Sequence, residues 1–324
     1  MAQLSFTTPG RGPARPERPP RSAPPARPYR RTSPFRRRQA IVAWMFALPF
    51  VAVFGVFMLL PLVSSFLMSF TDFRSSDMQT PTQVDFVAFG QYVHLFEDPA
   101  FRRALLNTGY FVLLGIPLTM VVALALAVAL NNGITRLRTV FRLGFYTPVV
   151  TSIVAVAVVW RYVLQSDGLV NTLLGHLGIH GPDWLHSTTW AMPSLILMAA
   201  WRNMGTLMII FLAGLQNVPH ELHEAAAIDG AGPMRRFVSV TLPLLRPTLL
   251  LGAVMLSVGY LQFFEEPFVM TQGGPLNSTL SATYYTFKQF GFGNYGQASA
   301  ASYVLFVAVA LLSLLQFRSL RAKD

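Results

Sequence analysis

The chain has 324 residues, of which 53% are hydrophobic and 12% charged, and its net charge is +11. This composition excludes an ordinary soluble domain, which carries about twice that share of charged residues, and predicts an integral membrane protein. The absence of cysteine excludes disulfides and thiolate metal sites, and none of the six histidines has the spacing of a metal-ligand set. We therefore expect no metal and no cofactor held by this chain.

Residues 1–38 form a tail rich in arginine and proline. They include ten arginines, nine prolines and a single acid, Glu17. Because proline blocks helix formation and few of these side chains are apolar, we expect the tail to be disordered. Its charged region is too long for a signal peptide. A nucleic-acid-binding arm is the alternative, but no aromatic interleaving or nucleic-acid-binding fold accompanies it. We interpret the tail as a cytoplasmic segment that fixes membrane topology and attracts anionic lipid, with no nucleic-acid partner.

Residues 39–324 contain six apolar stretches, each long enough for the ~20 residues of a membrane-spanning helix. The fold class is therefore all-α, because a helix satisfies its own backbone hydrogen bonds in lipid. The third stretch is the least regular, since Pro148 and Arg161 interrupt it. Other prolines within the stretches should kink the helices rather than end them: Pro49, Pro61, Pro117 and Pro193. The six predicted spans are 41–70, 104–130, 140–165, 190–215, 248–270 and 298–317.

Positive charge is distributed unequally among the connecting segments. Arginine is frequent in the tail, in loops 131–143 and 216–247, and after the last span. By contrast, residues 166–189 contain no lysine or arginine, and residues 271–297 contain only Lys288. The positive-inside rule therefore places both termini in the cytoplasm. An even number of spans requires the two termini to lie on the same side, which agrees.

Polar residues inside two spans are candidates for a substrate pathway. A charged side chain at the centre of a membrane helix costs ~2.5–3.5 kcal/mol on insertion scales, so it needs a reason. In the fourth span an arginine is followed by an amide and, one turn later, a hydroxyl; in the fifth, four residues share a helix face. Aromatic rings suit the apolar face of a sugar, and amides and carboxylates suit its hydroxyls. The candidates are Arg202, Asn203, Thr206, Gly259, Tyr260, Phe263 and Glu266.

Other interpretations of these residues stay open. Gly259 and Tyr260 are also consistent with simple helix packing. Glu265 and Glu266 are also consistent with hydration at the outer membrane surface. Arg202 and Glu266 are alternatively partners of each other, or of a second subunit.

A polar segment, residues 217–247, separates the fourth and fifth spans. Pro219 suits the first turn of a short helix and Gly230 suits its end. The small side chains at 225–227 let another protein approach closely, and Glu224 offers a carboxylate to a basic partner. The simpler interpretation is a cytoplasmic loop helix that contacts only lipid headgroups.

The spacing in this segment is specific. The pattern is E-A-A-x3-G-x9-[IV]-x-L-P, formed by Glu224-Ala225-Ala226, then Gly230 after three residues, then VTLP, which ends at Pro243, after nine more. This pattern resembles the EAA loop of bacterial ABC importer permeases. Only the tail lies outside the resemblance. Further stretches similar to the sugar-transporting branch follow in order at 48–73, 92–108, 136–164, 211–219 and 266–279.

The resemblance implies a permease subunit of an ATP-driven importer for a sugar or oligosaccharide, in the bacterial cytoplasmic (inner) membrane, and not an enzyme. In that family the EAA helix docks on cytoplasmic ATPase subunits, which bind the ATP. A second permease subunit and an extracytoplasmic solute-binding protein are the other implied partners. This chain has no G-x-x-x-x-G-K-[ST] segment, which fits that division of labour. The residues that correspond to the coupling segment are Glu224, Ala225, Ala226, Asp229, Gly230 and Pro243.

The same residues are also compatible with other functions. A polyol phosphate such as glycerol phosphate is an alternative cargo, with Arg202 serving the phosphate. A secondary transporter or channel usually shows intramembrane acidic relays or repeated halves, and neither is visible. An integral membrane enzyme would need a nucleophile–base or metal constellation within the spans, and none is recognisable. Two adjacent acids before Pro267, where many relatives have one, prevent a transfer of detailed substrate contacts.

Overall fold

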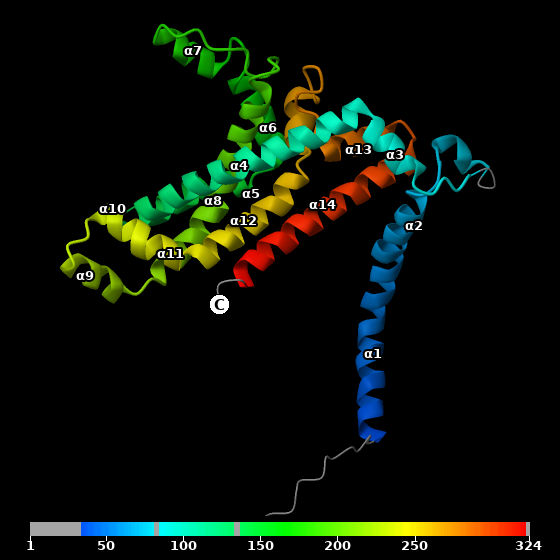
Figure 1. Ribbon diagram of the computed structural model, residues 1–324, viewed down its shortest axis with the longest axis horizontal. Coiled ribbons are helices and arrows are strands. Elements are labelled where there is room, and N and C mark those ends of the chain that lie inside the picture. Colours follow the sequence, from blue (N-terminus) through cyan, green and yellow to red (C-terminus); the bar gives the residue numbers. More distant parts are fainter. Residues whose placement is uncertain (1–33, 81–83, 133–136, 322–324) are drawn as a thin grey trace, which may run out of the picture. The chain divides into compact units, whose positions relative to one another are not determined.

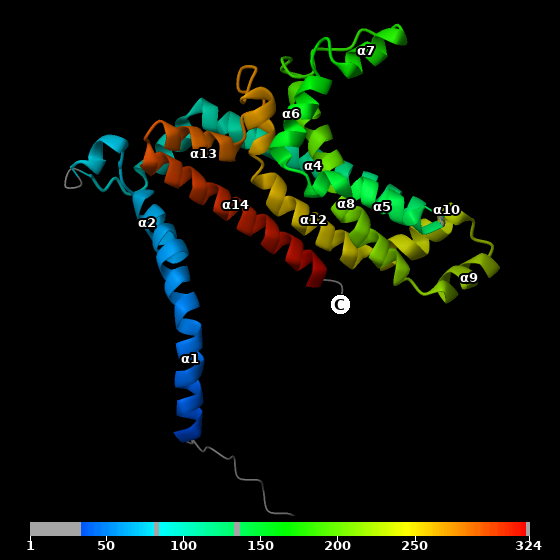
Figure 2. The ribbon, with the colours of Figure 1, turned by 180° about the vertical axis from the view of Figure 1, so that it is seen from behind.

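The computed structural model describes residues 34–80, 84–132 and 137–321 (Figures 1 and 2). Among these residues the backbone is helical or irregular, and the only β-type pairing is the single bridge between Thr71 and Phe86. The predicted all-α class is confirmed. The tail predicted to be disordered lies outside the described residues up to position 33. Its end is corrected, because helix α1 begins at Pro34 and residues 34–38 are helical. Proline is well tolerated at a helix start, and the arginines that follow are good helix formers.

The chain divides into two compact units after Met58. The first contains α1 (Pro34–Phe54), which continues through Pro49, and most of the π-helix η1 (Gly55–Leu59). The second unit begins with the end of η1 and with α2 (Leu60–Met68). The first predicted span thus corresponds to a helical run that includes a π-helical turn shortly before Pro61. Proline lacks the N–H that a regular α-helical turn needs at this position.

Four long helices organise the second unit: α4 (Pro99–Asn132), α8 (Ala191–Gln216), α12 (Arg246–Leu261) and α14 (Tyr295–Arg321). Helix α4 packs along α8 and α12, and α14 packs along α12, as both views show (Figures 1 and 2). Helix α8 is central, because 61% of its most apolar window is buried, against 22% for α14. The other helices keep many apolar side chains exposed, and we expect these to face lipid or a partner.

The third predicted span, 140–165, is not one straight helix. Helices α5 (Arg138–Val150) and α6 (Ile153–Val163) meet at an angle of 100°. Pro148 cannot donate a backbone hydrogen bond, which weakens the end of α5. The Thr147 and Thr151 hydroxyls each donate to the carbonyl four residues earlier, at 2.7 and 2.8 Å, a contact that bends helices.

The fifth predicted span, 248–270, is too long. Helix α12 ends at Leu261, and a π-helix, η5 (Pro267–Thr271), follows after a break. A continuous helix would require Pro267 to donate an N–H to the carbonyl of Phe263, which proline cannot do. Among the described residues four helices are long and apolar enough to cross a membrane, and the count reaches six when each of two bent pairs is one span. Six is the predicted number.

Shorter elements lie at the two ends of the long helices. Helix α9 (His220–Ile228), α10 (Pro233–Arg236), η4 (Phe237–Thr241) and α11 (Leu242–Leu244) follow the end of α8. At the other end lie α3 (Gly90–Glu97) and α13 (Ala282–Gly291), with α7 (Leu169–His176) after α6 (Figure 1). The 26 residues of α8 separate the two ends by about 39 Å at 1.5 Å per residue. The short helix η2 (Ser75–Met78) lies between α2 and α3 in the chain.

Candidate functional site

The polar segment forms the predicted short helix, α9, and its end is closed by a Schellman motif. Gly230 has a φ of +77°, a left-handed conformation that glycine adopts without strain. The Ala231 N–H donates to the Ala226 carbonyl at 2.9 Å, and the Gly230 N–H donates to the Ala227 carbonyl at 3.0 Å. Pro219 lies one position earlier than expected, as the N-cap residue.

The surface of α9 is open. None of its side chains is buried. The Glu224 side chain is 65% exposed, and its carboxylate lies 3.1 Å from Nδ1 of His220. Ala225 is exposed and Ala226 half-buried, while Ile228 is 87% exposed. Asp229 caps the helix on the same segment, whereas Pro243 lies in α11. A carboxylate, small side chains and an exposed apolar residue together form a surface suited to a protein partner.

Six of the seven predicted pathway residues line a single cavity of about 150 Å³. Thr206 is the exception, since it lies one turn further along α8 and is not part of the lining. Sequence reasoning missed other lining residues, among them Ile153 from α6 and Gln262 after α12. The six residues that the structure brings together are Arg202, Asn203, Gly259, Tyr260, Phe263 and Glu266.

The two aromatic rings of this cavity are held by helix α4. The Tyr260 hydroxyl lies 2.8 Å from Oγ1 of Thr119, and both groups are buried. The Phe263 ring stacks on that of Phe111, with centroids 3.9 Å apart and an interplanar angle of 4°. A Cβ added at Gly115 would lie 2.8 Å from Cε2 of Tyr260. In this conformation the rings therefore serve helix packing, and three residues spaced by four along α4 form their support.

Arg202 and Glu266 are not partners of each other. Glu266 is only 5% exposed, and its Oε2 has no hydrogen-bond partner among the described residues. Nε of Arg202 is likewise unpaired, and no ion pair joins the two side chains within the described chain. Two of the alternatives left open for Glu266, hydration at the membrane surface and an ion pair with Arg202 inside this subunit, therefore disagree with the structure. Asn203 donates to the Ala199 carbonyl of its own helix at 2.9 Å.

This arrangement offers a ligand both kinds of hydrogen-bonding group. Arg202 supplies donors and Glu266 supplies acceptors, and each has capacity that the described chain leaves unused. Buried polar atoms without partners are costly, so a ligand that satisfies both would be bound favourably. Within the described residues no group of three metal-ligating side chains occurs.

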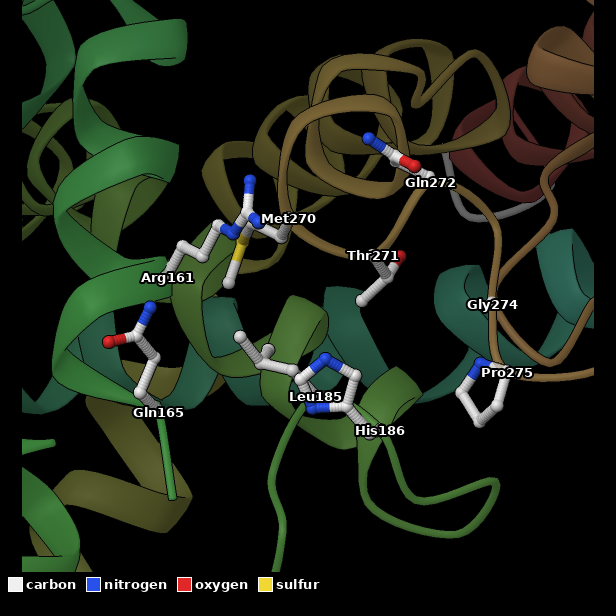
Figure 3. Close-up of a pocket in the computed structure, with 9 residues that line it drawn as sticks. All are labelled: Arg161, Gln165, Leu185, His186, Met270, Thr271, Gln272, Gly274 and Pro275. Carbon is white, nitrogen blue, oxygen red and sulfur yellow. The ribbon is translucent and has the colours of Figure 1, made fainter. Parts of the chain in front are cut away.

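A second cavity, of about 290 Å³, lies at the end of the helices opposite α9 and was not predicted (Figure 3). Arg161 and Gln165 come from α6 and the turn after it, and His186 comes from the segment before α8. The segment formed by η5 and its turn contributes Met270, Thr271, Gln272, Gly274 and Pro275. Nδ1 of His186 lies 3.0 Å from Oδ1 of Asp183. Partial burial would raise the pKa of Asp183, but hydrogen bonds from His186 outweigh it and lower that pKa below its usual value.

Comparison with known proteins places these features in a family. Residues 115–322 match the family described as "binding-protein-dependent transport system inner membrane component". A lactose transport system permease protein of Rhizobium radiobacter is 36% identical over 297 residues, which cover 90% of this chain and 98% of that protein. An arabinooligosaccharides transport system permease protein of Bacillus subtilis is 33% identical over 279 residues, covering 85% and 87%.

Among solved structures, the fold is similar to a chain of a bacterial alginate ABC transporter, solved in complex with an alginate pentasaccharide-bound periplasmic protein. The TM-score is 0.71 at 23% identity, and the similarity covers 88% of this chain and 96% of that one. This likeness concerns the fold.

Proposed function

The chain belongs to the family of binding-protein-dependent transport system inner membrane components, and we propose that it is one of two permease subunits of an ATP-driven importer. Its cargo is a sugar or an oligosaccharide, the kind of substrate named for the lactose and arabinooligosaccharide permeases that it resembles. It crosses the bacterial cytoplasmic membrane several times, with both termini in the cytoplasm. In this assembly the chain is a transport subunit and not an enzyme.

The observation that carries the proposal is the open surface of helix α9, which presents Glu224 and Ala225 beyond the end of α8. The sequence contains no segment of the G-x-x-x-x-G-K-[ST] type to cradle a triphosphate. Separate ATPase subunits therefore bind the ATP, and α9 is the surface through which their closure reaches the membrane helices.

The polar cavity has side chains suited to a sugar, but in this conformation its volume is too small to hold one. Its volume of about 150 Å³ lies below the ~300 Å³ at which ligand pockets begin. A sugar is admitted only after α6 separates from the segment that carries Tyr260 and Glu266. The carboxylate of Glu266 and the guanidinium of Arg202 then bind its hydroxyls, while the second permease subunit provides the facing wall and a solute-binding protein delivers the cargo.

Charge in the same cavity argues against a polyol phosphate as cargo. Arg202 contributes one guanidinium, whereas Glu265 and Glu266 contribute two carboxyl groups to the lining. A phosphate dianion needs more cationic partners than the one guanidinium that this lining supplies. The balance favours an uncharged sugar. In a secondary transporter or channel, helix α9 would have no use.

Co-purification tests the proposal. We expect an ATPase and a second permease to accompany the chain when it is extracted in mild detergent through a tag after Asp324. Glu224→Lys should remove the ATPase and abolish uptake while the protein stays in the membrane. Glu221→Lys is the matched control, because it reverses a charge on the same exposed helix outside the E-A-A-x3-G pattern. A chain that emerges alone, or full uptake in Glu224→Lys, would contradict the proposal.

A further inference from the structure

The cavity opposite α9 contains a guanidinium that has no ion-pair partner among the described residues. Arg161 lies in the last turn of α6 and contributes a guanidinium to the lining. Among the described residues no carboxylate lies within ion-pair distance of it. None of the nine lining residues is acidic. The cavity is therefore a site for a group that accepts hydrogen bonds and carries negative charge.

His186 is oriented toward the same space. The Asp183 carboxylate accepts from the His186 backbone N–H at 3.2 Å and holds Nδ1 of its ring at 3.0 Å. With Nδ1 donating to Asp183, Nε2 is the ring nitrogen left for a ligand, and it donates to an anion when the ring is in its imidazolium form. Figure 3 shows the ring of His186 and the Arg161 side chain at the border of one cavity, with Gln165 beside them.

The anion that suits this cavity is not the cargo. The polar cavity, which Ile153 of the same helix α6 lines, includes the carboxyl groups of Glu265 and Glu266 against a single guanidinium. That cavity offers an anionic sugar too few cationic partners, because a single guanidinium faces two carboxyl groups. We propose that the Arg161 cavity is a socket for an acidic side chain, Asp or Glu, of the solute-binding protein that docks on this end of the subunit.

The loop beside the socket supports a protein as the occupant. Leu276, directly after the lining residue Pro275, is 89% exposed and has a φ of +49°, a conformation that leucine rarely adopts. The loop is tied down around it, because the Asn107 side chain donates to the carbonyls of Asn277 and Leu280 at 2.8 and 3.0 Å. Protein interfaces combine apolar contacts with charged ones, and here the exposed Leu276 lies beside the cavity that contains Arg161.

The inference rests on the proposed function, since a solute-binding protein is a partner only in such an importer. The location agrees with it. Leu185 and His186 of the socket precede the first turn of α8, and α9 follows its last turn, so the two surfaces lie on opposite sides of any membrane that α8 crosses. If α9 meets the ATPase in the cytoplasm, the socket faces outward.

The experiment uses the complete importer in nanodiscs and, as its probe, the solute-binding protein that stimulates ATP hydrolysis by the wild-type complex. Arg161→Gln keeps a polar side chain and removes the charge, Arg161→Lys keeps the charge, and Leu276→Ser removes the apolar contact. Arg103→Gln is the matched control, since it removes an exposed arginine near the same end, outside the cavity. The dissociation constant of the probe is measured for each variant at low and high salt.

We expect Arg161→Gln to raise the dissociation constant about tenfold at low salt and to flatten its salt dependence, with Arg161→Lys restoring most of the affinity. Leu276→Ser should weaken binding without changing the salt dependence, and Arg103→Gln should leave both unchanged. In Arg161→Lys, a carbodiimide should couple the introduced amine to an Asp or Glu of the probe.

Wild-type affinity for the probe in Arg161→Gln overturns the socket while leaving the importer intact. If the same variant also loses galacturonate uptake relative to galactose, the cavity is a sugar-acid site instead. A different failure, in which no solute-binding protein stimulates the wild-type complex, would refute the proposed function and the socket with it.

Discussion

Substitution of Gly230 tests the coupling helix, because a new side chain there would strain the backbone without meeting any neighbouring atom. Its φ of +77° is left-handed, yet a Cβ added there would meet no atom within 4 Å. An L-residue in this conformation costs roughly 1–2 kcal/mol, with β-branched residues worst and asparagine best tolerated. In Gly230→Ala the native end of α9 is therefore disfavoured by a factor of about 5 to 30, and in Gly230→Val by more. Gly230→Asn should lose little.

The affinity of the wild-type ATPase subunits for the permease pair in nanodiscs measures this effect. If docking requires the native helix end, the apparent dissociation constant rises by the factor by which that end is depopulated. The expected order of affinity is wild type, asparagine, alanine, valine. Gly232→Ser serves as the control, because Gly232 has an ordinary φ of −66°. Undiminished affinity in Gly230→Val, or an asparagine variant as weak as the valine one, would refute the reasoning.

Two further predictions concern the helix contacts. Gly115→Ala places a Cβ 2.8 Å from the ring of Tyr260, so sugar uptake should fall. Gly109→Ala, on the same helix, meets no atom within 4 Å and should leave uptake unchanged. Equal uptake rates in the two variants would show that the position of Tyr260 does not matter for transport. Tyr285→Phe removes a hydroxyl that donates to Asp98 at 2.6 Å, so the protein should lose about 1.5–3 kcal/mol of stability, seen as a lower thermal midpoint in detergent; an unchanged midpoint would contradict this. Burial of the Tyr285 hydroxyl, together with its bond to Asp98, raises the pKa of that phenol, so the donor stays protonated throughout the physiological range.

The sequence was sufficient for the long helices and insufficient for the breaks between them. Apolar length identified the stretches that become α4, α8 and α14, because a membrane helix needs little beyond that length. It did not show that the third stretch turns by 100° between Val150 and Ile153, since both halves are apolar. Pro148 and Pro267 mark the two places where the predicted spans fail. A proline inside a span either kinks or ends it, and the surrounding packing decides which.

For the candidate site, local spacing carried the prediction and distant partners did not. The helix end at Gly230 and the shared face from Gly259 to Glu266 follow from residues close together in the chain. Thr119 meets Tyr260 across 141 positions, a contact that helical periodicity cannot reveal. Arg161 was seen only as an interruption of a span, because its surroundings come from two other segments of the chain.

Helix α9 has nine residues and buries none of its side chains. Isolated helices shorter than about 12–15 residues are marginal in water, so α9 gains little from the rest of the chain beyond the bonds that close its end. A protein that covers it therefore contributes to the folding of α9 as well as to the contact. The amide hydrogens of this segment should exchange rapidly with solvent in the lone subunit and slowly in the assembled complex. Folding of α9 and assembly of the complex are coupled equilibria.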